Sequence, residues 1–308
     1  GGPVGATWAM ASWTACWVSP MACSDTSIWA TSALISVLRL AQSADSSPAP
    51  SRTATKTAAP MTGGSQRGTL RTRSTVTTVA PVTTIDSAPD WRTRYDALRS
   101  TLLAQYQSIP TGAPVRLAKR TSNLFRPRDA VSTPGLDVAA FDGVLHVDPE
   151  SRTAEVLGMT TYEHLVAATL PYGLMPMCVP QLRTITLGGA VTGLGIESAS
   201  FRNGTPHESV VEMDILTGAG EILTVSGRAD DPNRDLFFGF PNSYGSLGYA
   251  LRLRIELEPT RPYVLLRHVR FATAEAMTDA MRQIASAREF EGRRVDFLDG
   301  TVFSADEQ

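Results

Sequence analysis

The residues with the clearest chemical potential lie in TITLGGAVTGLGIESASFRNG, residues 184–204. Its glycines stand at five positions: Gly188, Gly189, Gly193, Gly195 and Gly204. A glycine inside regular structure costs about 0.5–1 kcal/mol relative to alanine, so this density needs a compensating role. One such role is a positive backbone φ angle, and another is close approach of a ligand that any Cβ would block. Successive exposed N–H groups then form a nest for an anion such as a pyrophosphate. A structural bend without a ligand remains the alternative from this stretch alone.

Two familiar phosphate-binding motifs do not fit the stretch. A Rossmann fingerprint needs a third glycine at a fixed spacing after Gly195 and an acidic residue about 20 positions further on, in a strand–helix context that is missing here. A P-loop needs Gly-Lys-Ser/Thr, which does not follow.

Composition narrows the function classes. A chain of 308 residues holds one large domain or two medium ones. The net charge of −2 supplies no field for nucleic acid or anionic membranes, and no basic, aromatic-interleaved face is apparent. The three cysteines, Cys16, Cys23 and Cys178, form no CxxC and no zinc spacing, so we expect no metal site. Their odd number favours a reduced, intracellular protein over a disulfide scaffold, so we expect a cytoplasmic location. From the charge we expect no nucleic-acid partner.

Residues 1–88 differ from the rest of the chain. Between residues 40 and 85 nearly every residue is Ser, Thr, Ala, Pro, Gly or Arg, a composition too poor in apolar surface to offset the entropy of ordering. We expect 1–88 to be disordered or a non-native, out-of-frame extension. A Ser- and Arg-rich transit segment is one alternative. A membrane anchor at residues 27–40 is another, although it falls short of the roughly 20 apolar residues that span a bilayer. Peripheral membrane association is therefore kept open.

From Asp90 onward the sequence predicts a folded domain. Apolar side chains at helical spacing predict a helix over residues 91–106. The segments 143–148 and 153–158 flank a turn and predict two strands. Thr160 and Glu163 match a capping box, which predicts a helix from there through Leu170.

The second half of this region continues the mixture of strands and helices. The segments 209–216 and 221–225 predict a hairpin around TGAG. Residues 251–258 alternate strictly, which predicts a strand with Leu251, Leu253, Ile255 and Leu257 on a core and the charged residues in water. A helix capped by Thr273 follows. Hairpins without regular βαβ repeats indicate the α+β class.

The sequence around the glycines resembles the FAD-binding domain of the vanillyl-alcohol oxidase/p-cresol methylhydroxylase (PCMH) flavoprotein superfamily. The family's landmarks occur in order at Pro180, Thr186, Gly188, Gly189, Gly193, Gly195, Gly204, Gly220, Asp235, Leu236, Phe237, Gly245, Gly248 and Pro259. Within it, GIES followed by Ser and a basic residue is most similar to the sterol side-chain (Δ24) reductases and their bacterial relatives. The resemblance covers roughly residues 90–300. It implies a two-subdomain PCMH-type FAD-binding domain over 89–260, followed by a truncated substrate or cap domain over 261–308.

The resemblance also implies a set of cofactor contacts. The loop from Thr186 to Ser198 would wrap the flavin and its diphosphate, with backbone amides near Pro180 and the Gly188–Gly189 pair reaching the phosphates. The positions carried over are Pro180, Thr186, Leu187, Gly188, Gly189, Gly193, Leu194, Gly195, Ile196, Glu197, Ser198, Gly204 and Ile222, with Ser122 at the first phosphate loop. That first loop departs from the family, because AKRTSNLF replaces its glycines. Lys119, Arg120 or Arg126 could supply charge there, or form a solvated face.

The catalytic residues are less well defined than the cofactor loop. Arg202 is a candidate cation near the flavin N1 and His207 a candidate proton donor, although either could have only solvent or backbone partners. Cys178 is expected to be a buried apolar residue. None of the four histidines lies in a recognisable flavin-attachment motif, so we predict non-covalent FAD.

The resemblance implies an FAD-dependent oxidoreductase of a hydrophobic, sterol- or lipid-like small molecule. It would reduce a C=C bond or oxidise an alcohol, with NAD(P)H as one candidate electron donor. An FAD-binding module without turnover is the alternative, and an unliganded α+β protein is a third.

Overall fold

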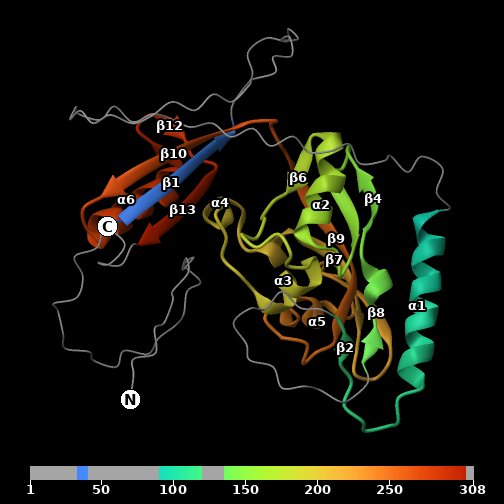
Figure 1. Cartoon of the computed structure of the whole chain (residues 1–308). Coiled ribbons are helices and arrows are strands. Elements are labelled where there is room, and N and C mark those ends of the chain that lie inside the picture. The colour runs from blue at the N-terminus through green and yellow to red at the C-terminus, as the bar shows by residue number, and fades with distance from the viewer. Residues whose placement is uncertain (1–32, 41–89, 120–134, 303–308) are drawn as a thin grey trace, which may run out of the picture.

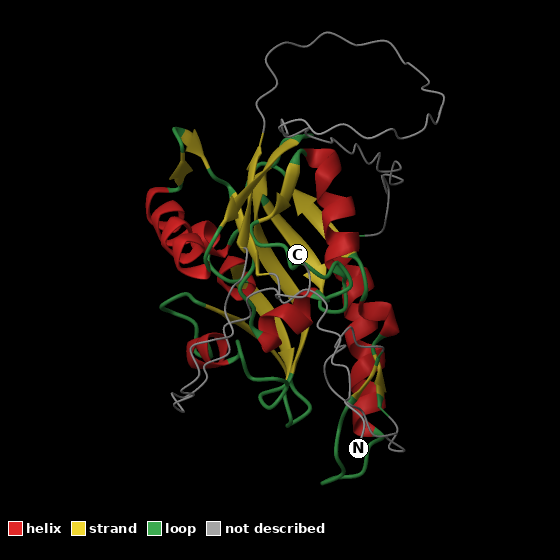
Figure 2. Cartoon of the chain, turned by 60° about the vertical axis from the view of Figure 1, so that its left-hand side comes forward, coloured by secondary structure: helices red, strands yellow, loops and turns green. Residues whose placement is uncertain are grey.

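The computed structural model describes residues 33–40, 90–119 and 135–302. Helices and strands alternate irregularly along the chain, as expected for the α+β class (Figure 1). Six strands form the larger sheet: β4 (Val144–Asp148), β5 (Thr153–Leu157), β6 (Leu174–Pro176), β7 (Val210–Leu216), β8 (Ile222–Ser226) and β9 (Tyr249–Pro259). After a 60° turn, the strands lie in the middle of the molecule with helices on either side (Figure 2).

The long strand β9 is the centre of this sheet. The order is β4-β5-β9-β7-β8, β6 pairs with the C-terminal end of β9, and every pairing is antiparallel. The two predicted hairpins are confirmed as β4–β5 and β7–β8. β9 has a hydrogen-bonded neighbour on each edge, so its side chains point to the two faces of the sheet. They are buried wherever a helix packs on either face.

Helices cover both faces of the larger sheet. The helix α1 (Trp91–Gln107) packs on one face, together with the short parallel strands β2 (Leu117–Ala118) and β3 (Leu136–Asp137). The other face carries the helices α2 (Tyr162–Thr169) and α3 (Leu187–Gly193). The remaining short helical segments are η1 (Ala139–Phe141), η2 (Leu170–Tyr172), α4 (Ser200–Asn203), η3 (Pro206–Ser209) and α5 (Arg234–Gly239).

The predicted helix over 91–106 is confirmed as α1. Asp90 caps it by accepting from the Arg92 amide, and Tyr95 and Leu102 are buried against the sheet. The predicted start of α2 is one residue too early. Thr161 is the N-cap, because its hydroxyl accepts from the His164 amide, whereas Thr160 bonds the backbone of Gly143 in both directions.

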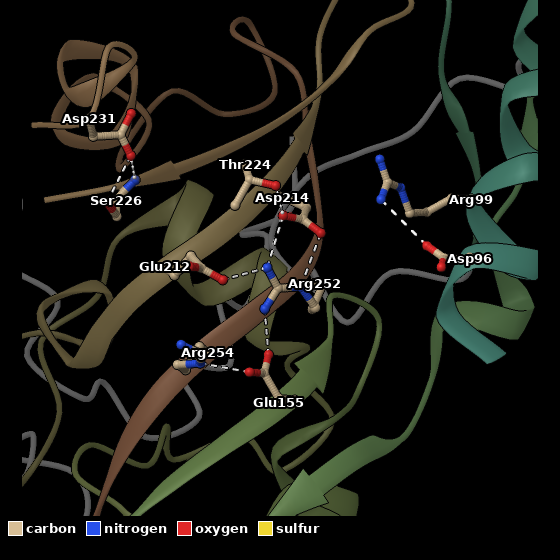
Figure 3. Close-up of polar contacts among 10 residues, drawn as sticks. All are labelled: Asp96, Arg99, Glu155, Glu212, Asp214, Thr224, Ser226, Asp231, Arg252 and Arg254. Atoms are coloured by element: carbon tan, nitrogen blue, oxygen red, sulfur yellow. Dashed lines mark hydrogen bonds and ion pairs between the residues drawn. The ribbon is translucent and has the colours of Figure 1, made fainter. Parts of the chain in front are cut away.

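The prediction that the charged face of β9 lies in water is wrong at Arg252. Only 5% of this residue is exposed, and its guanidinium contacts Glu155 of β5 together with Glu212 and Asp214 of β7 (Figure 3). Helix α1 covers this face, with the Tyr95 ring 5.9 Å from the guanidinium carbon. Burial lowers the pKa of Arg252, but the carboxylates outweigh it, so the pKa is raised and the charge is kept.

Leu251 also departs from the strict alternation. The β7–β9 register shifts between the pairs Asp214–Arg252 and Ile215–Ala250, which leaves Leu251 unpaired. It therefore packs in the α1-side core, whereas Leu253 packs in the core on the opposite face.

A smaller sheet follows Pro259. It contains β10 (Val264–Phe271) and β13 (Phe297–Val302), and α6 (Ala274–Ala287) packs on it through Met277 and Ile284. Thr273 caps α6, as predicted. The hairpin strands β11 (Glu289–Phe290) and β12 (Arg293–Arg294) lie between α6 and β13. The boundary at residue 260 stays a prediction.

The strand β1 (Ala33–Leu40) corrects one expectation for residues 1–88. It pairs antiparallel with both β10 and β13, so this part of the segment forms a strand in the middle of the smaller sheet. The rest of 1–88 lies outside the described residues. Within the described ranges, no helix combines the length and the apolar character needed to cross a membrane.

Replacing Arg252 should destabilise the fold strongly. Arg252→Met leaves Glu155 and Asp214 buried without their shared cation, which should lower the free energy of unfolding at pH 7 by about 3–5 kcal/mol. The matched control is Arg254→Met, because Arg254 is partly exposed and contacts Glu155 alone; it should cost about 1 kcal/mol or less. Urea denaturation measures both.

The Arg252→Met loss should also depend on pH. Burial raises the pKa of Asp214, but the hydrogen bonds and charge of Arg252 outweigh it, so the net shift is downward. The wild type therefore holds a stabilisation that is present above the ordinary Asp pKa and lost as pH falls through the lowered one. The difference between wild type and variant should shrink in acid, and a pH-independent difference would contradict this account.

Candidate functional site

A cavity of about 490 Å³ lies beside α3 and reaches Leu117 and Met159, which pack against the core on the α1 side of the sheet. Its wall is mainly glycine backbone and apolar side chain, with Lys119 and Glu197 as the charged residues among those that line it. The lining residues are Leu117, Lys119, Met159, Pro180, Leu182, Thr184, Ile185, Thr186, Gly188, Gly189, Ala190, Thr192, Gly193, Leu194, Gly195, Glu197, Pro206, Tyr244, Gly245, Tyr249 and Ala250. This volume falls in the range of small-molecule and cofactor sites.

The first half of the predicted glycine loop is a helix. Thr186 is the N-cap of α3 and accepts a hydrogen bond from the Gly189 amide at 3.2 Å. The Leu187 amide donates to the Thr160 carbonyl, and the Gly188 amide donates to the Gly158 carbonyl at 2.9 Å. The amides of Gly188 and Gly189 are therefore engaged within the chain, and the predicted phosphate nest at this pair does not form.

Gly188 is required by packing. A Cβ on Gly188 would lie 2.7 Å from the Gly158 carbonyl oxygen at the end of β5. A Cβ on Gly189 would lie 2.8 Å from the Thr186 hydroxyl that caps the helix. Gly188 lets α3 dock on the sheet, and Gly189 leaves room for the Thr186 cap, which supports the structural alternative at this pair.

Gly193 and Gly195 are different, because the protein itself leaves space beside them. Outside its own helix and its chain neighbours, no described residue has an atom within 4 Å of a Cβ built on Gly193, and a Cβ on Gly195 would meet only the Glu197 carboxylate, at 3.6 Å, among the described residues. Leu194 between them has φ +58° and ψ 148°, a strained conformation for a residue with a side chain. Among the described residues, none accepts a hydrogen bond from the amides of Gly195 or Ile196. Close approach of a ligand remains the best reason for these glycines.

The other predicted cofactor residues separate into those at the cavity and those away from it. Pro180 lines it, whereas Leu187, the first residue of α3, is fully buried in the core beneath the helix. Ile196 is 54% exposed, and the Ser198 carbonyl accepts from the Leu298 amide of β13. Gly204 has φ +77°, and a Cβ built on it would overlap the Glu208 carboxylate.

Two further predicted cofactor positions do not appear in the described wall of the cavity. Ile222 packs against the α1-side core and is not among the lining residues. Ser122 lies outside the described residues, as do Arg120 and Arg126.

Arg202 holds two parts of the structure together and does not line the cavity. Its guanidinium forms a bidentate pair with Glu258 at 2.6 and 2.8 Å and donates to the Asp296 carbonyl. The Glu258 hydrogen bonds raise its pKa. Arg202 is therefore neither a solvated cation nor a cation directed at the cavity. Its contacts connect α4 to the end of β9 and to the residue that precedes β13 of the smaller sheet.

His207 is positioned by its own turn. Its Nδ1 lies 2.8 Å from the Thr205 hydroxyl in η3, and burial lowers its pKa, so the ring is neutral at pH 7. It does not line the cavity, although its neighbour Pro206 does. Cys178 is buried, as predicted, and burial raises the pKa of its thiol.

The sequence reasoning missed the wall that faces α3. The Tyr244 amide donates to the Thr192 carbonyl at 3.0 Å, which brings Tyr244 and Gly245 against the helix end, and Tyr249 and Ala250 of β9 lie behind them. Gly245 is one of the family landmarks in the sequence, but the position of this turn beside α3 depends on a tertiary contact.

No metal centre is apparent in the described residues. No group of three or more His, Cys, Asp or Glu side chains within these ranges is arranged to hold a metal ion.

Comparison with known proteins assigns the cavity-forming region. Residues 110–226 match the family described as "FAD binding domain". This chain carries an FAD-binding domain of the PCMH-type flavoprotein superfamily. The match contains most of the cavity wall, α3 and the Gly193–Gly195 turn included. Oxidoreductase relatives support the same assignment.

The chain is similar to two groups of curated proteins. Delta(24)-sterol reductase of Pisum sativum is 26% identical over 174 residues, which cover 55% of this chain and 30% of that protein. Cytokinin dehydrogenase 5 of Oryza sativa subsp. japonica is 32% identical over 134 residues, which cover 44% of this chain and 24% of that protein. The chain thus spans less than a third of the length of these relatives.

A solved structure is also similar. 6-Hydroxy-D-nicotine oxidase from Arthrobacter nicotinovorans aligns with a TM-score of 0.37 and 16% identity, covering 41% of this chain and 26% of that one.

Filling the space beside Gly193 should weaken FAD binding without unfolding the FAD-binding domain. Gly193→Val places two methyl groups at the cavity wall, where no described residue outside its own helix lies within 4 Å of a built Cβ, so we expect at least a tenfold loss of FAD affinity, about 1.4 kcal/mol. The matched control is Gly218→Val in the β7–β8 turn, which is equally open but away from the cavity. Flavin fluorescence titration and thermal unfolding measure the two effects. Equal FAD affinities for both variants would contradict the proposed role of Gly193.

Proposed function

We propose that this chain is the FAD-binding part of an FAD-dependent oxidoreductase that holds its flavin non-covalently in the cavity beside α3. In this proposal residues 89–260 bind the cofactor and residues 261–308 begin the part that covers the substrate. The substrate is a hydrophobic, sterol- or lipid-like small molecule, and the reaction is reduction of a C=C bond or oxidation of an alcohol, as in a Δ24-sterol-reductase-like enzyme. A cytoplasmic location with peripheral membrane contact belongs to the same proposal.

The observation that carries this proposal is the turn at Gly193–Gly195. It combines glycines with no described neighbour close enough to clash with a built Cβ, a strained Leu194 and a Gly195 amide that donates to no described residue, and all three residues line the cavity, which lies largely in the matched FAD-binding region. Backbone strain of this kind persists where the surrounding structure enforces it, and it clusters at ligand sites. Such a turn suits a flat, extended ligand better than a plain structural bend.

Different residues of the cavity would contact different parts of bound FAD. Apolar atoms of Met159, Leu182 and Leu194 would cover ring surfaces and exclude water, and Lys119 would face the diphosphate charge. Bound FAD supplies hydride-transfer chemistry, while the protein sets its position and its electrostatic surroundings.

The proposed substrate class is drawn from the sequence resemblance and from the names of the relatives. The relatives are named as a reductase of sterols and a dehydrogenase of cytokinins, so the sterol-like substrate rests on the GIES resemblance. NAD(P)H is our candidate electron donor.

Anaerobic reduction of the FAD-loaded chain tests the proposed function. The chain should bind one FAD with a flavin absorption spectrum, and NADPH or a sterol-like donor should bleach it. FAD that binds but stays oxidised with every donor would favour a binding module without turnover. A chain that takes up no FAD would contradict the proposal as a whole.

The mode of attachment has its own test. Acid denaturation of the FAD-loaded chain should release all yellow colour into the supernatant, because no covalent bond holds the flavin. Absorbance of supernatant and pellet measures this, and colour retained in the washed pellet would show a covalent link.

A further inference from the structure

Glu197 is the one acidic side chain among the described residues that line the cavity. It follows the Gly193–Gly195 turn, and one of its carboxylate oxygens accepts from the Gln181 amide at 3.0 Å. The other oxygen points toward Gly195, since a Cβ built there would lie 3.6 Å from it. One carboxylate oxygen is therefore held by a backbone amide, and the other faces the cavity.

The smaller sheet fixes the backbone that carries Glu197. The Leu298 amide of β13 donates to the Ser198 carbonyl at 2.9 Å, and the Glu197 amide donates to the Ser200 hydroxyl. Arg202 adds a second link, through Glu258 of β9 and the Asp296 carbonyl. Glu197 consequently lies where the FAD-binding sheet meets the smaller sheet, on a turn with little freedom to move.

The surroundings of Glu197 disfavour its negative charge. Burial is the main cause that raises its pKa, and Asp299 of β13 raises it further, while the Gln181 amide acts in the opposite direction. The titratable and charged groups that face it or share its cavity are Asp299, Cys178, Tyr162, Lys119, Tyr244 and Tyr249. Such a carboxylate is easily protonated when another negative charge forms in the cavity.

We propose that Glu197 is the proton-transfer residue of this site: it takes up a proton when bound flavin is reduced and returns it when flavin is reoxidised. The proposal rests on the proposed function, because it needs FAD in the cavity. The carboxylate form accepts the proton and the acid form donates it, so one group serves both directions of the reaction.

The proton and electron balance is simple. In alcohol oxidation the substrate C–H bond breaks, its hydride goes to oxidised flavin, its O–H proton goes to the Glu197 carboxylate, and a carbonyl product forms. In C=C reduction one carbon receives a hydride from reduced flavin, and the other receives the proton from the Glu197 carboxylic acid. Each direction transfers two electrons and two hydrogens, with flavin as the redox partner.

Redox potentiometry of the FAD-loaded full chain tests the proposal without any substrate. Flavin is reduced stepwise with dithionite, and the slope of its midpoint potential against pH gives the protons taken up per two electrons. Wild type should take up one proton more than Glu197→Gln within an interval above the ordinary Glu pKa. Glu163→Gln is the matched control, because Glu163 is an exposed residue that pairs with Arg183 on the outer side of α2.

A second variant keeps the test independent of the fold of Glu197→Gln. Asp299→Asn removes a negative charge that raises the pKa of Glu197, so the interval of extra proton uptake should move to lower pH. Identical slopes for wild type and Glu197→Gln would overturn the proposal, as would an interval that Asp299→Asn leaves in place. Loss of the extra proton in Glu163→Gln would also count against it. Failure of wild type to bind FAD would instead contradict the proposed function.

Discussion

The candidate site depends on a stack of three backbones with no side chain between them. The Gly188 amide of α3 donates a hydrogen bond to the Gly158 carbonyl at the end of β5, and the Gly158 amide donates to the Leu251 carbonyl of β9. A Cβ on Gly188 would lie 2.7 Å from the Gly158 oxygen, and one on Gly158 would overlap the Ala250 carbonyl. Because neither contact can yield by moving a side chain, the end of β5 sets the position of α3 and of the turn that follows it.

The two faces of the sheet then have complementary roles. On the α1 side, Arg252 of β9 ties β5 and β7 together through Glu155, Glu212 and Asp214. On the other side, β5 and β9 support α3, whose residues line the cavity. A binding site built on rigid elements holds its contacts more closely than one on free loops. The buried ion network therefore stabilises the platform, although replacement by a well-packed apolar set need not destabilise it.

Local pattern predicted most of the elements, and tertiary contacts decided the rest. The helix at 91–107, both hairpins and the Thr273 cap follow from periodicity and turn residues. The burial of Arg252 could not be read from alternation, since β9 reads as a two-faced strand until α1 is placed over it. A tertiary contact also explains why Thr161 and not Thr160 caps α2, because the Thr160 hydroxyl is hydrogen-bonded to the backbone of Gly143.

The glycine run shows how far the sequence reaches at the site itself. Its composition located the cavity wall, and eight of the predicted positions line it: Pro180, Thr186, Gly188, Gly189, Gly193, Leu194, Gly195 and Glu197. The sequence could not separate glycines that a helix needs for docking from those that a ligand needs for access. It also offered Arg202 as a cofactor cation, because its partner Glu258 lies 56 positions away. The strand β1 was missed for a similar reason, since its pairing partners lie far along the chain.

Hydrogen exchange with and without FAD tests the central claim most directly. If FAD lies against the turn after α3, its addition should slow exchange of amides at residues 193–198, where Gly195 and Ile196 donate to no described residue, and at 244–250 across the cavity. Amides of α1 and α6 should not change beyond the general stabilisation. Protection confined to other segments, with 193–198 exchanging as fast as before, would contradict the assignment of this cavity to the cofactor.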